Sequence, residues 1–246
     1  MTVEVKELSK EYHDQRKGSV KAVNNVSFSC KAGEVFGLLG PNGAGKTSTL
    51  RIIATILKPS AGHVSVAGFD VVKQSEDVRK NIGFLSNETR LYPRLTPREV
   101  IRLFGRLYHY PKEKLEARVN ELIELLDMQE FADVWCEKLS TGTQQKASIA
   151  RAVVHDPQVI ILDEPSSGLD VPTVRTVHNF IRAYRERGKC IVFSTHVMSE
   201  AQKMCDRIAV IYRGQITAEG SFTELQEQTG HSDLEDLFLS LTKGGS

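Results

Sequence analysis

Long apolar runs are missing from this chain. No stretch approaches the roughly 20 consecutive apolar residues that a membrane-spanning helix requires. Residues 1–10 are charged and contain no apolar segment of signal-peptide length. We therefore expect a chain that does not cross a membrane by itself, so that any role at a membrane depends on a second chain.

Paired cysteines and blocks of like charge are missing too. The cysteines are scattered without a C-x-x-C pair, which disfavours a disulfide framework or a zinc site. Reduced and mostly buried thiols in a cytosolic protein explain them better. The formal net charge is +1 and no long basic block occurs, so there is no electrostatic reason to expect a nucleic-acid partner. The cysteines are Cys30, Cys136, Cys190 and Cys205.

The composition that remains is that of an ordinary globular protein, with 40% apolar and 26% charged residues. A length of 246 residues suits one large α/β domain, or one domain with a subdomain inserted. Residue patterns predict strands at 3–8, 23–30, 63–66, 82–85, 159–162 and 190–194, and a hairpin over 208–219. A charged link joins the first two strands at 13–19. Helices are predicted over 48–57, 114–128 and 173–187, with an amphipathic tail at 233–241.

A glycine-rich segment carries the strongest chemical signal. Residues 40–47 read Gly-Pro-Asn-Gly-Ala-Gly-Lys-Thr and match the phosphate-binding pattern G-x-x-x-x-G-K-[ST] between an apolar strand and a helix. Glycines let backbone N–H groups surround phosphates, Lys46 adds a positive charge, and the Thr47 hydroxyl is placed to hold Mg²⁺. The alternative is a chance glycine-rich turn. The predicted nucleotide contacts are Gly40, Pro41, Asn42, Gly43, Ala44, Gly45, Lys46, Thr47 and Ser48.

A second element follows the apolar run at 159–162, which suits a central parallel strand. Its end carries two acids, Asp163 and Glu164. Beside a phosphate loop, Asp163 would hold Mg²⁺ through water, and Glu164 would orient or deprotonate the attacking water. The alternative is a strand that merely ends in acids.

Three further segments make the pattern specific. Ser140 lies at 139–143, before a helix; residues 166–170 follow the acid pair directly; and His196 ends the next strand. Taken singly, Ser140 could be a helix N-cap and His196 a structural hydrogen bonder. Their common order and spacing are not explained by chance.

With these motifs, the chain resembles the ATP-binding cassette (ABC) family of transport ATPases over residues 3–225. The matching parts are Walker A at 40–47, Walker B at 159–163, the catalytic glutamate at Glu164, the signature at 139–143, the D-loop at 167–170 and the switch histidine at His196. Tyr12 lies in the region of the aromatic residue that stacks on adenine.

The resemblance implies an α/β fold, in which a P-loop NTPase core carries an antiparallel β subdomain and an inserted helical subdomain. The nucleotide-binding domain would cover residues 1–230, with the helical subdomain at about 90–155 and a C-terminal helical tail at 231–246. A capping box at 96–99, with proline at the first helical position, marks a helix start inside that insert.

The resemblance also implies Mg²⁺-dependent ATP hydrolysis in a head-to-tail dimer of two copies. Each ATP would lie between the phosphate loop of one copy and Ser140 and Gly142 of the other, while Asp170 crosses the interface and His196 contacts the γ-phosphate. Two departures stand out. The signature reads Ser-Thr-Gly-Thr where Ser-Gly-Gly-Gln is commoner, and Asn87 replaces the usual glutamine that links Mg²⁺ and water to the membrane partner.

Within the family, residues 91–99 and 139–142 are most similar to ATPase subunits of two-component bacterial exporters, the sodium-extruding ones above all. This resemblance implies a peripheral protein on the cytoplasmic face of the membrane, bound near residues 84–110 to a separate permease. Two alternatives stay open: a soluble cassette ATPase without a transport role, and a phosphate-loop kinase or switch. The signature, Glu164 and His196 together oppose the kinase, and the absence of a second cassette opposes translation-type ATPases.

Overall fold

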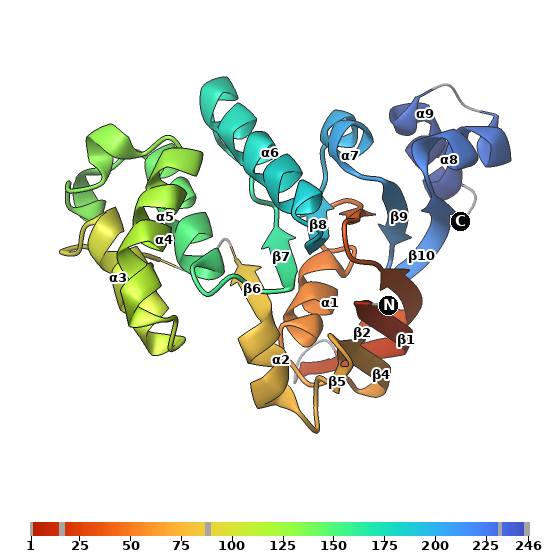
Figure 1. Ribbon diagram of the computed structural model, residues 1–246. Coiled ribbons are helices and arrows are strands. Elements are labelled where there is room, and N and C mark those ends of the chain that lie inside the picture. The colour runs from red at the N-terminus through yellow and green to blue at the C-terminus, as the bar shows by residue number, and fades with distance from the viewer. Residues whose placement is uncertain (1, 15–17, 87–89, 231–232, 244–246) are drawn as a thin grey trace.

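A six-stranded sheet forms the centre of the computed structural model, which describes residues 2–14, 18–86, 90–230 and 233–243 (Figure 1). Its strand order is β10-β9-β3-β8-β7-β6, parallel throughout except for β10. The strands are β3 Val35–Leu39, β6 Ile82–Leu85, β7 Val159–Asp163, β8 Cys190–Thr195, β9 Arg207–Tyr212 and β10 Gln215–Gly220. The apolar runs at 35–39 and 159–162 are therefore strands inside a parallel sheet, as their continuous burial requires.

A second, antiparallel sheet has the order β2-β1-β4-β5. Its strands are β1 Val3–Asp14, β2 Gly18–Cys30, β4 Ala61–Val66 and β5 Phe69–Asp70. The sequence predicted a charged link at residues 13–19. This was wrong for residues 13–14 and 18–19, which belong to β1 and β2. His13 pairs with Ser19 and Asp14 with Gly18, so both strands continue into a hairpin. The reason is that cross-strand backbone pairing does not need apolar side chains.

Helices cover the sheets and form a separate group beside edge strand β6. In Figure 1, α3, α4 and α5 lie on one side of β6, far from α8 and α9 at the opposite end of the sheet. The helices are α1 Lys46–Ile53, α2 Ser75–Asn81, α3 Pro97–Leu107, α4 Lys112–Leu125, α5 Thr141–Val153, α6 Val171–Glu186, α7 Met198–Met204, α8 Phe222–Thr229 and α9 Leu234–Lys243. The predicted fold class is confirmed. Among the described residues, no helix is both long and apolar enough to cross a bilayer.

Two helices end earlier than their apolar periodicity predicted. Helix α1 ends at Ile53 instead of residue 57, and α4 ends at Leu125 instead of residue 128. In both, a non-glycine residue just beyond the helix, Thr55 or Asp127, adopts positive φ. The backbone N–H groups at Thr55–Ile56 and Asp127–Met128 turn back to the last carbonyls in a Schellman arrangement. A glycine normally takes the positive φ at such a helix end. Because neither position is a glycine, the sequence gives no obvious sign that the helices end there.

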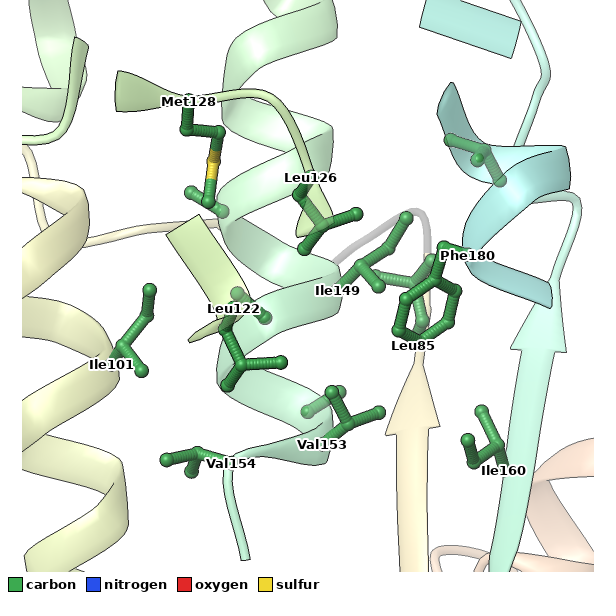
Figure 2. Packing of buried hydrophobic residues seen from close by; sticks show 14 of the residues in the cluster. Leu85, Ile101, Leu122, Leu126, Met128, Ile149, Val153, Val154, Ile160 and Phe180 are labelled. Carbon is green, nitrogen blue, oxygen red and sulfur yellow. The ribbon is translucent and has the colours of Figure 1, made fainter. Parts of the chain in front are cut away.

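The helical group is joined to the sheet by a continuous apolar core. Figure 2 shows this core, where Leu85 of β6 and Phe180 of α6 lie close to Ile149 of α5. The capping box predicted at Thr96 is present, with Glu99 returning the hydrogen bond, and it fixes the start of α3. Helix α5, which begins within the predicted signature at 139–143, therefore packs against both the helical group and the six-stranded sheet.

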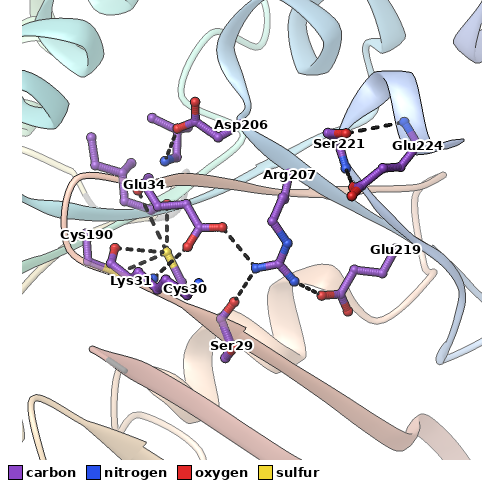
Figure 3. A network of polar contacts seen from close by, with 12 residues as sticks. Ser29, Cys30, Lys31, Glu34, Cys190, Asp206, Arg207, Glu219, Ser221 and Glu224 are labelled. Atoms are coloured by element: carbon purple, nitrogen blue, oxygen red, sulfur yellow. Dashed lines mark hydrogen bonds and ion pairs between the residues drawn. The ribbon is translucent and has the colours of Figure 1, made fainter.

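None of the four cysteines forms a disulfide, and three of them are buried, which confirms the prediction of mostly buried thiols. Cys190 Sγ lies 3.0 Å from Cys30 Sγ, and this contact together with burial raises the pKa of the Cys30 thiol well above its usual range. Figure 3 shows the adjoining polar network, in which Arg207 binds the Ser29 carbonyl and the carboxylates of Glu34 and Glu219. The network connects the two sheets.

His155 follows the end of α5 and stacks on Tyr108, with ring centroids 3.8 Å apart. Its Nε2 lies 2.9 Å from the Ile82 carbonyl, so the neutral ring donates a hydrogen bond to β6. Burial lowers the pKa of His155 from 6.5 to about 4. The folded state therefore favours the neutral ring.

We expect the free energy of unfolding to fall as the pH drops from 6.5 towards 4. In that range the unfolded chain binds a proton that folded His155 does not, which removes up to about 3 kcal/mol of stability. His155→Gln keeps an amide donor for Ile82 but does not titrate, so its unfolding free energy should change less over the same range. Urea unfolding of both proteins at pH 7 and pH 4.5 measures the difference; parallel losses would contradict it.

Candidate active site

The phosphate loop joins β3 to α1, and two of its glycines are required by close packing. A Cβ atom on Gly40 would lie 2.2 Å from the Ile211 carbonyl oxygen, and one on Gly45 would lie 2.4 Å from the Ala22 oxygen. Gly45 also has a φ of 106°, which favours glycine. Glycine at these positions therefore lets the loop pass close to β9 and β2 and directs the first backbone N–H groups of α1 to its mouth.

Lys46 is 3% exposed, and its ammonium group is surrounded by oxygens. Nζ donates to the carbonyls of Gly40 and Pro41 at 2.6 and 3.1 Å, and lies 3.3 Å from Glu164 Oε1. An ammonium group has three protons, so these three acceptors use its full capacity. An incoming phosphate must therefore replace one of them, and the Glu164 carboxylate is the one that is not part of the loop itself.

Thr47, Asp163 and Ser194 form a set of hard oxygen donors. The hydroxyls of Thr47 and Ser194 donate to Asp163 Oδ1 at 3.3 and 2.6 Å. Asp163 is 3% exposed at the end of β7, where it pairs with Ser194 of β8. No group of three or more His, Cys, Asp and Glu side chains that could hold a metal occurs in the described part of the chain. The donors fit Mg²⁺, which takes few protein ligands and keeps its waters and substrate oxygens.

Glu164 joins the phosphate loop to His196. Its carboxylate lies between Lys46 and His196, whose Nδ1 is 3.2 Å from Oε2. The backbone of Glu164 has a φ of 49°, in the left-handed region, and its N–H donates to the hydroxyl and carbonyl of Ser194. Such strained backbone is typical of functional sites. The bend lets the side chain turn back over the loop.

Tyr12 reaches the same site from β1. Its hydroxyl lies 3.2 Å from Ser48 Oγ, and its ring is 38% exposed with the Lys10 ammonium 5.2 Å from the ring centroid. A cavity of about 220 Å³ opens beside the loop. Its lining residues are Ala22, Asn42, Gly43, Gly45, Lys46, Thr47, Ser48 and Glu164.

The signature and D-loop residues take different positions. Exposed Ser140 caps α5 by accepting a hydrogen bond from the Thr143 N–H at 3.2 Å, and exposed Asp170 caps α6. Hydrogen bonds from Thr173 hold the pKa of Asp170 below its usual range. A Cβ on Gly142 would lie 2.7 Å from Thr173 Oγ1. Within the described residues, no hydrogen bond or ion pair links Ser140, Gly142 or Asp170 to the phosphate loop.

The comparison with known families decides the class of protein. The family model described as ABC transporter matches residues 23–167, more than half of the chain. The chain belongs to the ABC transporter family. It is 40% identical to the ABC transporter ATP-binding protein NatA of Bacillus subtilis over 95% of both lengths. It is also 38% identical to the Nod factor export ATP-binding protein I of Neorhizobium galegae, covering 89% of this chain and 62% of that one.

Solved structures agree with this assignment. The structure of an ATP-binding subunit of an ABC transporter superposes with a TM-score of 0.89, at 28% identity and over 98% of this chain and all of the other. A dimeric, post-hydrolysis cassette, MJ0796 bound to ADP and phosphate, gives a TM-score of 0.80 at 29% identity, over 89% and 98% of the two chains. The chain is therefore an ABC-type, ATP-binding ATPase, as the resemblance predicted.

This ABC ATPase brings together five of its predicted site residues and leaves others apart. Contacts link Lys46 to Glu164, Glu164 to His196 and Thr47 to Asp163, and Ser194 joins Asp163 to the backbone of Glu164. The signature and D-loop residues remain on the surface of the single chain. Asn87, the predicted substitute for a glutamine, lies outside the described residues.

Sequence reasoning missed a buried polar group behind the His196 segment of the cassette. His178 of α6 and Glu200 of α7 contact each other beside a cavity of about 290 Å³ that also borders Glu164 and His196. They lie on separate helices and belong to no motif. A glutamate in the first turn of a short helix and a histidine within an amphipathic helix look like ordinary surface residues until the fold brings them together.

Proposed function

We propose that the chain is the ATP-hydrolysing subunit of a two-component exporter, which energises transport through a separate membrane permease and extrudes Na⁺. The observation that carries the hydrolytic part is the Glu164 carboxylate held between Lys46 and His196. The export part is supported by relatives whose names concern export and resistance, including the daunorubicin resistance ATP-binding protein DrrA3 of Streptomyces coeruleorubidus, 36% identical over 88% of this chain. The sodium part rests on the resemblance of residues 91–99 and 139–142.

Each residue of the site has a definite task in this proposal. Lys46 exchanges Glu164 for the β- and γ-phosphates of ATP, and the released carboxylate orients or deprotonates the attacking water. Thr47 and Asp163 hold Mg²⁺, which neutralises charge on the phosphates when bound. His196 donates a hydrogen bond to the γ-phosphate. The corresponding role of Asn87, a water-mediated contact with Mg²⁺, stays a prediction.

We propose that a second copy of the chain completes each site. Ser140 is exposed at the start of a 13-residue helix, α5, whose first backbone N–H groups and positive dipole end suit the γ-phosphate of a nucleotide bound to the other copy. Gly142 lets the start of α5 lie close to Thr173 of α6, near the backbone that would face the nucleotide, and Asp170 reaches across the interface. Tyr12 stacks on adenine. The dimeric MJ0796 cassette supports this arrangement.

The permease would bind in a groove of about 270 Å³ between the nucleotide-binding core and the helical group. Ile56 is 57% exposed and Tyr108 is 40% exposed at this groove, which is otherwise apolar apart from Arg79 and Arg151. An amphipathic permease segment with an acidic side chain fits that lining. The groove residues are Ala54, Ile56, Arg79, Ile82, Phe84, Phe104, Tyr108, Arg151 and Ala152. Such docking would place the ATPase at the cytoplasmic face of the membrane.

The decisive experiment expresses the chain with the membrane protein encoded beside it. We expect the two to co-purify and, in sealed vesicles with ATP and Mg²⁺, to move ²²Na⁺ away from the ATPase side. Ile56→Glu should abolish co-purification by burying an unpaired charge, whereas Val72→Glu, 46% exposed in the wild-type chain and outside the groove, should not. Failure to co-purify with any membrane protein would favour the soluble, non-transport ATPase, and ATP-driven movement of another solute would exclude sodium.

A further inference from the structure

A chain of buried and partly buried hydrogen bonds runs from α6 through α7 to the segment that carries His196. His178 Nε2 lies 2.9 Å from Glu200 Oε1, and the other oxygen of Glu200 accepts a hydrogen bond from the Thr195 hydroxyl at 2.7 Å. The Thr195 hydroxyl in turn accepts from the Val197 N–H at 3.0 Å. Glu200 is 8% exposed and Thr195 is 2% exposed, so the hydrogen bond between them is buried, whereas the bonds to His178 and Val197 are partly buried. Two of the bonded residues, Thr195 and Val197, are the immediate neighbours of His196 in the chain.

The segment that holds His196 has few other restraints. His196 itself is exposed, and its side chain lies 3.2 Å from the Glu164 carboxylate. The backbone carbonyl of Thr195 accepts from the Gly40 N–H at 3.3 Å, which aligns the end of β8 with the phosphate loop. The direction that the chain takes after Thr195 depends on the Thr195 hydroxyl, because that hydroxyl binds the N–H on the far side of His196. Glu200 orients this hydroxyl.

Glu200 can perform this task only as a charged carboxylate with both oxygens occupied. Burial opposes its charge, whereas the hydrogen bond from His178, together with the neighbouring hydroxyls of Ser166 and Thr195, holds the pKa of Glu200 below its usual range. Without the Nε2–H of His178, one oxygen of a buried carboxylate would lose its partner, which favours rearrangement of α7 or entry of water from the adjoining cavity. The two neighbouring charged groups at that cavity are Glu164 and Lys203.

We propose that His178 and Glu200 are positioning residues for hydrolysis: through Thr195 they fix the turn that presents His196 to the γ-phosphate. This inference rests on the proposed role of His196. Among the described residues, the polar partner of the His178 side chain is Glu200 and no residue of the phosphate loop, so His178 affects the rate of the chemical step and leaves nucleotide binding nearly unchanged.

Steady-state ATPase kinetics of three variants test the proposal. His178→Leu should lower kcat by about tenfold with KM for ATP changed less than about twofold. His178→Gln, whose amide can occupy the Nε2 position, should restore most of kcat. Equal melting temperatures for the two variants would show that the loss in kcat does not come from unfolding. His178→Leu with wild-type kcat, or His178→Gln no better than His178→Leu, would overturn the proposal.

A double-mutant cycle separates this proposal from the proposed function itself. His196→Ala should lower kcat strongly, and adding His178→Leu to it should produce little further loss, because the histidine that His178 positions is already gone. Full additivity of the two losses would overturn the positioning role alone. Wild-type kcat in His196→Ala would overturn the proposed role of His196 and this inference with it.

Discussion

Glu164→Gln is expected to lower the ATPase rate by a factor of about 100 to 10,000, the range that a positioned general base contributes. The same change should tighten ATP binding. The Glu164 carboxylate lies 3.3 Å from Lys46, so it competes with phosphate for the lysine's charge. Glutamine removes that competition while keeping a side chain of the same length. ATP-bound dimers should therefore accumulate on a sizing column.

Glu113→Gln is the matched control, because it makes the same chemical change at an exposed position in the first turn of α4. It should hydrolyse ATP at the wild-type rate. Two outcomes would count against the role of Glu164: fast turnover in Glu164→Gln, or loss of ATP binding together with turnover. The second outcome would mean that the carboxylate supports the loop through Lys46 and has no direct part in the chemistry.

The elements that carry the nucleotide site were predictable because their signals are local. The glycine pattern at 40–47, the apolar run at 159–162 and the capping box at Thr96 each lie within a few consecutive residues. Each reports a backbone requirement that does not depend on the rest of the fold. The order of these signals along the chain was enough to indicate the family.

The elements that were missed depend on tertiary contacts. Strand β5 has two residues, and α7 has seven, too few to show a period. The helix stop at Thr55 uses a left-handed residue that the surrounding packing imposes. His178 and Glu200 are brought together by α6 and α7 packing side by side, and no spacing in the sequence encodes that contact. The positioning network behind His196 therefore needed a structure.

A mixing experiment tests whether the ATP sites are shared between two copies. Lys46→Ala disables the phosphate loop, and Ser140→Asp places a negative charge where the γ-phosphate of the other copy would bind. Aspartate caps helices as well as serine does, so α5 should keep its start at residue 140. Each variant alone should be nearly inactive. Random pairing makes about half of the dimers mixed, with one complete site of two, so a mixture should regain about a quarter of wild-type activity.

The control for the capping substitution is Ser221→Asp, which changes the N-cap of α8 in the same way but lies outside both halves of the site. The Ser221→Asp variant should remain active without being mixed with another variant. Mixed dimers are counted by giving the two variants different affinity tags. If mixed dimers form but regain no activity, the sites are not shared between copies. In a mixed dimer with shared sites, one site combines the intact phosphate loop of one copy with the intact signature helix of the other and should be active. Regained activity in proportion to the mixed dimers instead requires that Ser140 of one copy serve Lys46 of the other.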